Sequence, residues 1–277
     1  MKSVMIKTHE VWLETIMAAF MSSGENKVRL FDFADILFRH FTWLENELIM
    51  IGEEYTYDRS ALHVQVTHLS ELLQHIVKKF SDIDLQLAGS PDRNLAHRIS
   101  SDLHYMRDVM LKMKDERVEA FNKELHYPGA VLSEDATKAF TRFLFEESYK
   151  EYELILIYNY LRAHSNDAYI NRIYQILIEE SQYHFKSFGN MMAKMGILSV
   201  PRIVLKELYQ VTDIVKFLNG GIEEELAAKE ECRMLSEAVA KDSKELANFF
   251  DFINRQENYH IELMKDALAY YTKDIDA

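Results

Sequence analysis

The sequence predicts an all-α fold, an antiparallel four-helix bundle with additional helices on its N-terminal side. The 277 residues include only 8 Gly and 3 Pro, the two residues that most disfavour a helix interior. Apolar residues recur three, four and seven positions apart, which is the spacing of one helix face. No segment shows the alternation that is typical of a strand. Together these patterns favour helices throughout.

Turn-forming residues divide the chain into these helices. Pro cannot donate a hydrogen bond inside a helix, and Gly and Ser favour turns, so clusters of these residues mark breaks. The breaks are Ser22-Ser23-Gly24, Gly89-Ser90-Pro91, Pro128-Gly129, Ser165-Asn166-Asp167, Ser199-Val200-Pro201 and Gly220-Gly221. The predicted helices are 9–22, 28–56, 60–88, 92–125, 135–164, 168–197, 202–218, 221–242 and 244–273.

The long N-terminal helices each carry an apolar stripe. The stripes are Phe33, Ile36, Leu37, Leu44 and Ile51, then Leu62, Leu69, Leu73, Ile76 and Phe80, then Leu95, Ile99, Leu103, Met106 and Met110. We expect residues 1–130 to be an N-terminal helical region. A helical flap, a partner-binding face and a diverged copy of the bundle are the alternatives for its role.

The last four long helices predict the connectivity of the bundle itself. Helices 135–164 and 168–197 are joined by a tight turn, and so are 221–242 and 244–273. One long crossover, 198–220, links these two hairpins, so residues 131–277 are predicted to form one four-helix domain.

Composition and charge exclude several classes of function. A net charge of −13 argues against binding to nucleic acid, whose phosphates attract Lys and Arg. The single Cys232 excludes an internal disulfide and fits a reducing compartment. The first residues lack the apolar run of a signal peptide, and no apolar stretch is long enough to span a bilayer. We therefore expect a cytoplasmic protein without a membrane partner.

Two acid–histidine pairs lie within apolar stripes. Glu180 and His184 share a face with Ile170, Ile173, Leu177, Phe188, Met191 and Met195, and Glu257 and His260 share one with Leu246, Phe249, Ile253, Met264 and Tyr271. An unpaired buried carboxylate costs several kcal/mol, roughly, and a bound metal is one arrangement that offsets this cost. The two pairs therefore predict a metal site inside the bundle.

The other two helices are expected to supply further carboxylates. Glu147 and Glu151 lie in the apolar stripe of helix 135–164, at the level of the first Glu/His pair. In helix 221–242, Glu224 and Glu231 lie on the side of Ala227, Ala228, Leu235, Ala238 and Val239. Glu231 is nearer the level of Glu257 and is preferred. Which of Glu147 and Glu151, and which of Glu224 and Glu231, is the ligand stays open.

This pattern resembles the ferritin-like di-iron carboxylate superfamily over residues 135–275. The resemblance rests on Glu257-Asn258-Tyr259-His260 and on the connectivity; the other pair, Glu180 and His184, is spaced by four with Ser181 where the family pattern has Glu. By this resemblance, Glu257 and His260 would hold one metal, and Glu180 and His184 the other. Carboxylates with imidazole suit iron or manganese, so two Fe ions or an Fe/Mn pair are expected.

The resemblance implies reaction with O2 or peroxide, as an oxidase or oxygenase acting on a small molecule or as a ferroxidase. A homodimer is compatible with it. The alternative is a non-catalytic helical adaptor or regulatory protein in which the Glu/His pairs are structural. A second site is also considered, either at His40 and Glu47 or at His68, Glu71 and His75. The His68 group and His104 lie opposite the apolar stripes of their helices, so these histidines are expected to be exposed.

Overall fold

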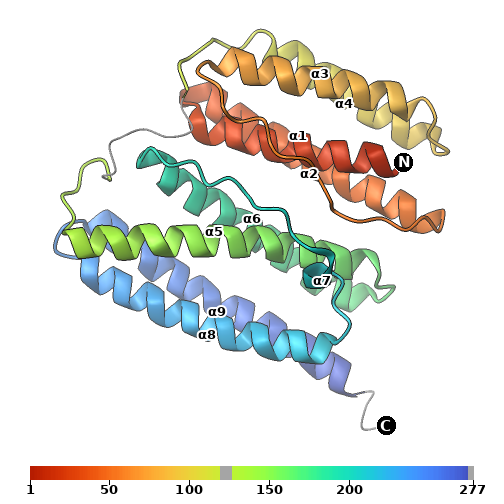
Figure 1. The fold of residues 1–277 in the computed structure, drawn as a ribbon. Helices are drawn as coiled ribbons and strands as arrows, with labels where there is room; N and C mark the ends of the chain where they lie inside the picture. Colours follow the sequence, from red (N-terminus) through yellow and green to blue (C-terminus); the bar gives the residue numbers. More distant parts are fainter. Residues whose placement is uncertain (119–126, 274–277) are drawn as a thin grey trace. The chain divides into compact units, whose positions relative to one another are not determined.

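The computed structural model describes residues 1–118 and 127–273, and it confirms the all-α prediction: within these residues there are helices and no strand. The helices are α1 (Lys2–Met21), α2 (Gly24–Met50), α3 (Leu69–Leu87), α4 (Arg93–Met110), α5 (Glu134–Ala163), α6 (Ala168–Lys194), α7 (Lys206–Tyr209), α8 (Ile214–Val239) and α9 (Lys244–Lys273) (Figure 1). No described helix combines the length and apolar character needed to cross a bilayer.

The chain forms two compact units. Unit 1 comprises Met1–Lys123 with Gly196–Lys206, and unit 2 comprises Glu124–Met195 with Glu207–Ala277. The sequence had divided the chain at residue 130, with the whole crossover in the second domain. In the structure, the first part of the crossover belongs to unit 1 instead.

The four long helices of each unit pair in the same pattern. In unit 2, α5 packs on α6 and α8 packs on α9, while α5 also contacts α8 and α6 contacts α9. In unit 1, α1 packs on α2 and α3 on α4, while α1 also contacts α3 and α2 contacts α4. A long connection separates the two hairpins in both cases (Figure 1). This shared order is what a diverged copy of the bundle would have.

Unit 2 is a helical bundle with a core of aromatic side chains. The rings of Phe143 and Phe188, which join α5 to α6, lie edge to face with their centroids 5.7 Å apart. Phe250 of α9 meets Phe140 at 5.7 Å and Phe143 at 5.6 Å. Such contacts are favourable beyond the area they bury. Phe188 of α6 also meets Phe249 of α9 at 6.2 Å, so both helices contribute to this core.

Helix α3 begins nine residues later than the predicted start at residue 60. Glu71 caps this helix by accepting the backbone N–H of His68 at 3.4 Å. Upstream, the N–H of Ser60 donates to Glu10 at 2.8 Å and that of His63 to Glu14 at 3.0 Å. These contacts tie the non-helical segment before α3 to carboxylates of α1. At the other end, α4 stops at Met110, and residues 119–125 of the predicted helix 92–125 lie outside the described residues.

The crossover was also predicted with a wrong boundary. Gly220-Gly221 does not break the chain but lies inside α8, which begins at Ile214, where Asp213 accepts a hydrogen bond from the backbone N–H of Lys216. Of the predicted helix 202–218, only α7 and the first residues of α8 are helical. A Cβ on Gly221 would lie 3.1 Å from the Met264 sulfur, whereas one on Gly220 would meet nothing within 4 Å. Close packing against α9 therefore accounts for Gly221.

This difference predicts that alanine substitutions at Gly220 and Gly221 change the free energy of unfolding by different amounts. Because Gly in a helix interior is less stable than Ala, Gly220→Ala should raise the free energy of unfolding by about 0.5–1 kcal/mol. Gly221→Ala should gain less or lose stability, since its methyl group displaces Met264. Urea unfolding of both variants, followed by circular dichroism, measures the difference. Equal gains would contradict the packing argument.

Candidate metal centre

The two predicted histidines meet inside unit 2. The helix of the first, α6, begins at the α5–α6 turn, where the Asp167 carboxylate accepts the N–H groups of Tyr169 and Ile170 at 2.8 and 3.0 Å. His184 of α6 and His260 of α9 are both buried, and their ring centroids lie 5.1 Å apart. The sequence placed both on inward faces, and the structure agrees.

Carboxylates surround His184 on two helices. Its Nδ1 lies 2.9 Å from Oε1 of Glu151, on α5, and 3.8 Å from Oε1 of Glu257, on α9. Glu151 and Glu257 are each about 5% exposed or less, so both carboxylates are removed from water. Of the two predicted candidates on α5, Glu151 is therefore the one that contacts a histidine.

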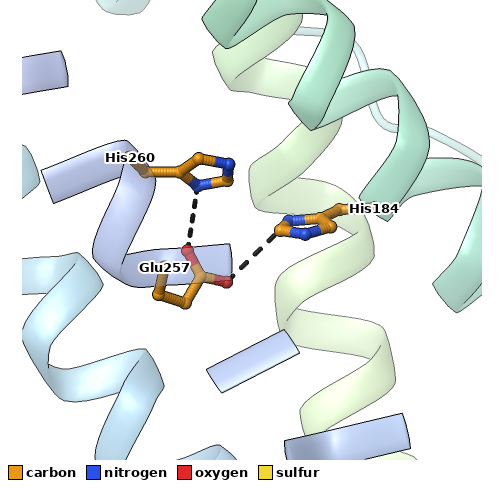
Figure 2. A group of neighbouring side chains, drawn as sticks. All are labelled: His184, Glu257 and His260. Carbon is orange, nitrogen blue, oxygen red and sulfur yellow. Dashed lines mark ion pairs between the residues drawn. The ribbon is translucent and has the colours of Figure 1, made fainter. Parts of the chain in front are cut away.

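Glu257 lies between the two imidazoles (Figure 2). Its Oε2 is 2.9 Å from Nδ1 of His260, one turn further along α9. One ligand atom each from His184, Glu257 and His260 lies within 4.8 Å of the others, which is the spacing of a group that can hold one metal ion. Among the described residues, no other group of three or more His, Cys, Asp or Glu side chains meets this spacing.

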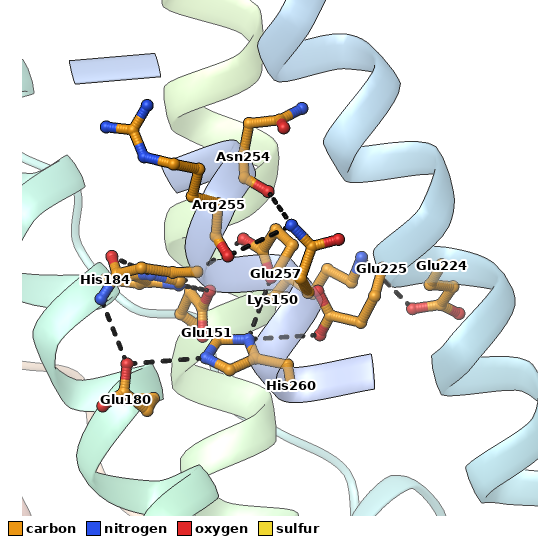
Figure 3. A network of polar contacts seen from close by, with 12 residues as sticks. Lys150, Glu151, Glu180, His184, Glu224, Glu225, Asn254, Arg255, Glu257 and His260 are labelled. Atoms are coloured by element: carbon orange, nitrogen blue, oxygen red, sulfur yellow. Dashed lines mark hydrogen bonds and ion pairs between the residues drawn. The ribbon is translucent and has the colours of Figure 1, made fainter. Parts of the chain in front are cut away.

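Glu180 closes the network from α6 (Figure 3). Its Oε2 lies 3.8 Å from Nε2 of His260 and accepts a hydrogen bond from Nε2 of Gln256 at 3.2 Å. The Gln256 side-chain oxygen is 3.1 Å from Nε2 of His184. Gln256 thus links the two predicted acid–histidine pairs, a contact that the sequence analysis missed.

Helix α8 contributes Glu225, and the preference for Glu231 is wrong. Glu225 is 6% exposed, and its Oε1 lies 3.9 Å from Nδ1 of His260. Glu231 is exposed and lines a groove of about 390 Å³, while Glu224 is also exposed and pairs with Lys150 at 3.4 Å. Two side chains that are six residues apart on a helix point in directions that differ by about 240° around the helix axis. Glu231 therefore points away when Glu225 points inward.

The buried stripe of α8 was the signal that could have identified Glu225. Its members are Leu218, Glu225, Ala228, Cys232, Leu235, Ser236 and Val239. Counting back from Val239 in steps of three and four reaches Cys232 and then Glu225. Cys232 is a buried free thiol, and burial raises its pKa above the ordinary value.

The charges of this cluster are unbalanced. Five carboxylates lie at or near it, those of Glu147, Glu151, Glu180, Glu225 and Glu257, against Lys150 and the two imidazoles. Burial raises the pKa of Glu147 to about 7 and that of Glu225 well above its ordinary value. Although burial opposes it, the nearby carboxylates of Glu180 and Glu257 raise the pKa of His260 to about 11. The raised pKa values of Glu147 and Glu225 favour their protonated forms, and a divalent cation would compete with those protons.

Several buried polar atoms of the cluster lack a hydrogen-bond partner. These are Oε2 of Glu151, Oε2 of Glu257 and Nε2 of His260. Oε2 of Glu257 is close enough to His260 for an ion pair, but the angles of this contact are not those of a hydrogen bond. Buried polar atoms are nearly always satisfied, so three orphans around one point call for an explanation. A metal ion bound by carboxylate and imidazole fits this donor set.

The second-site candidates in unit 1 are not brought together. His40 pairs with Asp102 at 2.9 Å rather than with Glu47. His68 is exposed at the start of α3 and pairs with Asp115 at 3.1 Å, while Glu71 caps the helix. His75 lies 3.5 Å from Glu14 of α1, a residue that already accepts a bond from Lys79 at 2.9 Å.

Comparisons with known proteins find no match for this chain, whether among protein-family models, curated proteins or solved structures.

Proposed function

We propose that unit 2 is a ferritin-like metal domain that binds iron or manganese and uses O2 or peroxide as an oxidant. The observation that carries this proposal is the buried group His184, Glu257 and His260, whose ligand atoms lie within 4.8 Å of one another. The order of hairpin, long crossover and hairpin is consistent with such a domain. An oxidase or oxygenase and a ferroxidase are the two forms that the activity would take.

Each residue would have a definite part at the centre. Glu257 lies between the imidazoles and would be a bridging or a terminal ligand, with His184 and His260 on either side. Glu151 and Glu225 flank these histidines from α5 and α8, and Glu180 does so from α6, so these three carboxylates could serve as ligands of a second ion. Bound iron or manganese supplies the electrons for reduction of O2 or peroxide.

A structural role for the cluster is the second candidate. Both ring nitrogens of His184 already have partners, Glu151 and Gln256. If the pairs only stabilise the bundle, the domain would serve as a helical adaptor. The orphaned atoms of Glu151, Glu257 and His260 favour the metal instead.

Metal uptake separates the two candidates. Protein purified without an affinity tag should contain iron or manganese, and Fe(II) or Mn(II) added to metal-free protein under nitrogen should raise its melting temperature. A ligand at 100 times its dissociation constant stabilises by about 2.7 kcal/mol. Glu257→Ala and His260→Ala should lose both the metal and the shift.

The controls are histidines on polar faces. His68→Ala and His104→Ala remove side chains that are about half exposed, and they should keep the metal-induced shift. Wild-type protein that takes up neither Fe(II) nor Mn(II), and melts at one temperature with or without them, would establish the adaptor reading.

A further inference from the structure

Tyr158 carries a buried hydroxyl that the metal centre does not use. It lies on α5 seven residues after Glu151, so both side chains are on the same helix face. Tyr158 is 1% exposed, and its hydroxyl has no hydrogen-bond partner. Phe would fill the same space without burying an unpaired hydroxyl, so packing alone does not account for a tyrosine here. The charges of Glu225 and Glu151 act on this hydroxyl and, after burial, raise its pKa further.

Contacts continue from Tyr158 through other tyrosines. Its ring stacks on that of Tyr174 of α6, with centroids 6.1 Å apart. The Tyr174 hydroxyl is 3.1 Å from that of Tyr271 on α9. Tyr271 meets the ring of Tyr270 at 5.5 Å, and Tyr270 meets that of Tyr169 at 6.0 Å.

The series ends at the surface. Tyr169 is 54% exposed, whereas Tyr158 and Tyr174 are fully buried. Near this end the Tyr270 hydroxyl donates to Oδ2 of Asp167 at 2.6 Å. The Asp167 carboxylate, whose other oxygen caps α6, is therefore placed to take a proton from Tyr270 when that phenol loses an electron.

We infer that Tyr158, Tyr174, Tyr271, Tyr270 and Tyr169 form a relay that carries electrons from the surface to the centre of unit 2. The relay rests on the proposed function, because it needs an oxidant at the centre. It gives that function a route to an external reductant, and it assigns a role to a buried hydroxyl that otherwise lacks one.

The electron balance of the step is complete for peroxide. Reduction of hydrogen peroxide to two water molecules takes two electrons and two protons. Fe(II), when bound, would supply one electron; Tyr158 would supply the other together with one proton, and solvent would supply the second proton. Tyr174 then returns an electron and a proton to Tyr158, and the oxidised site moves outward in the same way. At the surface, ascorbate restores the last tyrosine by giving one electron and one proton.

The test traps the oxidised tyrosine at its exit. Full-length protein loaded with Fe(II) under nitrogen is mixed with hydrogen peroxide and a nitroso spin trap, without ascorbate, and adducts are located by peptide mass spectrometry. The wild type should carry an adduct on Tyr169, and metal-free protein should carry none. Tyr174→Phe keeps the stacked ring and removes only the hydroxyl, so the adduct on Tyr169 should be lost.

Tyr183 provides the matched control. It is 45% exposed, and its ring lies 5.9 Å from that of His184, so it is a shorter exit than the relay. Tyr183→Phe should leave the adduct on Tyr169 in place. An adduct on Tyr183 instead, or one on Tyr169 that survives Tyr174→Phe, would overturn the relay. The Fe(II)-induced rise in melting temperature is measured on each variant, and Tyr174→Phe should retain it. A wild type that shows this rise but no adduct refutes the relay alone, whereas a wild type without the rise refutes the metal site beneath it.

Discussion

Lys79→Met is expected to lower the free energy of unfolding of the full-length protein by about 3–5 kcal/mol, the cost of removing one partner from a buried ion pair. The Lys79 ammonium of α3 lies 3.0 Å from Oε2 of Glu10 and 2.9 Å from Oε1 of Glu14, both on α1. The side chain of Glu14 is fully buried and that of Glu10 is 8% exposed. Met keeps the length of the side chain, so the loss would come from two carboxylates left without their cation.

A neighbouring lysine gives the control for this prediction. Lys78 is exposed and should tolerate replacement by Met with little change in stability. Adding Glu10→Gln and Glu14→Gln to Lys79→Met should recover much of the loss, because amides carry no charge and can still accept the backbone N–H groups of Ser60 and His63. Thermal unfolding followed by circular dichroism measures all three variants. Equal melting temperatures for Lys78→Met and Lys79→Met would show that the ion pairs contribute nothing.

The buried carboxylates of the two units have different partners. In unit 2, carboxylates from α5, α8 and α9 surround two histidines and leave buried atoms unsatisfied. In unit 1, the two carboxylates on α1 surround a lysine from α3, the helix that corresponds to α8 in the pairing order. The Lys79 ammonium thus supplies the positive charge beside these two carboxylates.

Local periodicity was enough to predict the parts of the fold and site that depend on one helix at a time. The inward positions of His184, Glu257 and His260 follow from their apolar neighbours three, four and seven residues away. The predicted start at residue 60 was wrong because the conformation of that segment depends on distant residues instead. No local pattern shows that the N–H groups of Ser60 and His63 bond to carboxylates on α1, some fifty residues earlier in the chain.

The carboxylate of α8 was missed for a different reason. Glu223, Glu224 and Glu225 are consecutive, so the charge pattern alone assigns none of them to the core. The expected start at Gly221 also placed these residues in the first turn of the helix, where acidic residues are common at the surface. Once α8 is seen to begin at Ile214, Glu225 lies three turns inside the helix and on its buried stripe.

Glu225→Gln is expected to weaken binding of Fe(II) or Mn(II) by about 100-fold, at the upper end of what the loss of a group supporting a metal ligand costs. Glu225 is buried beside His260, and its carboxylate is the contribution of α8 to the charge that attracts a divalent cation. Glu231→Gln is the same substitution in the same helix, but this side chain is exposed, so its effect should be small. Titration of metal-free protein, followed by calorimetry, gives both dissociation constants. Because the two variants make the same chemical change, a difference between them would report the position of the side chain. If Glu231→Gln weakened binding as much as Glu225→Gln, the centre would not extend to the buried stripe of α8.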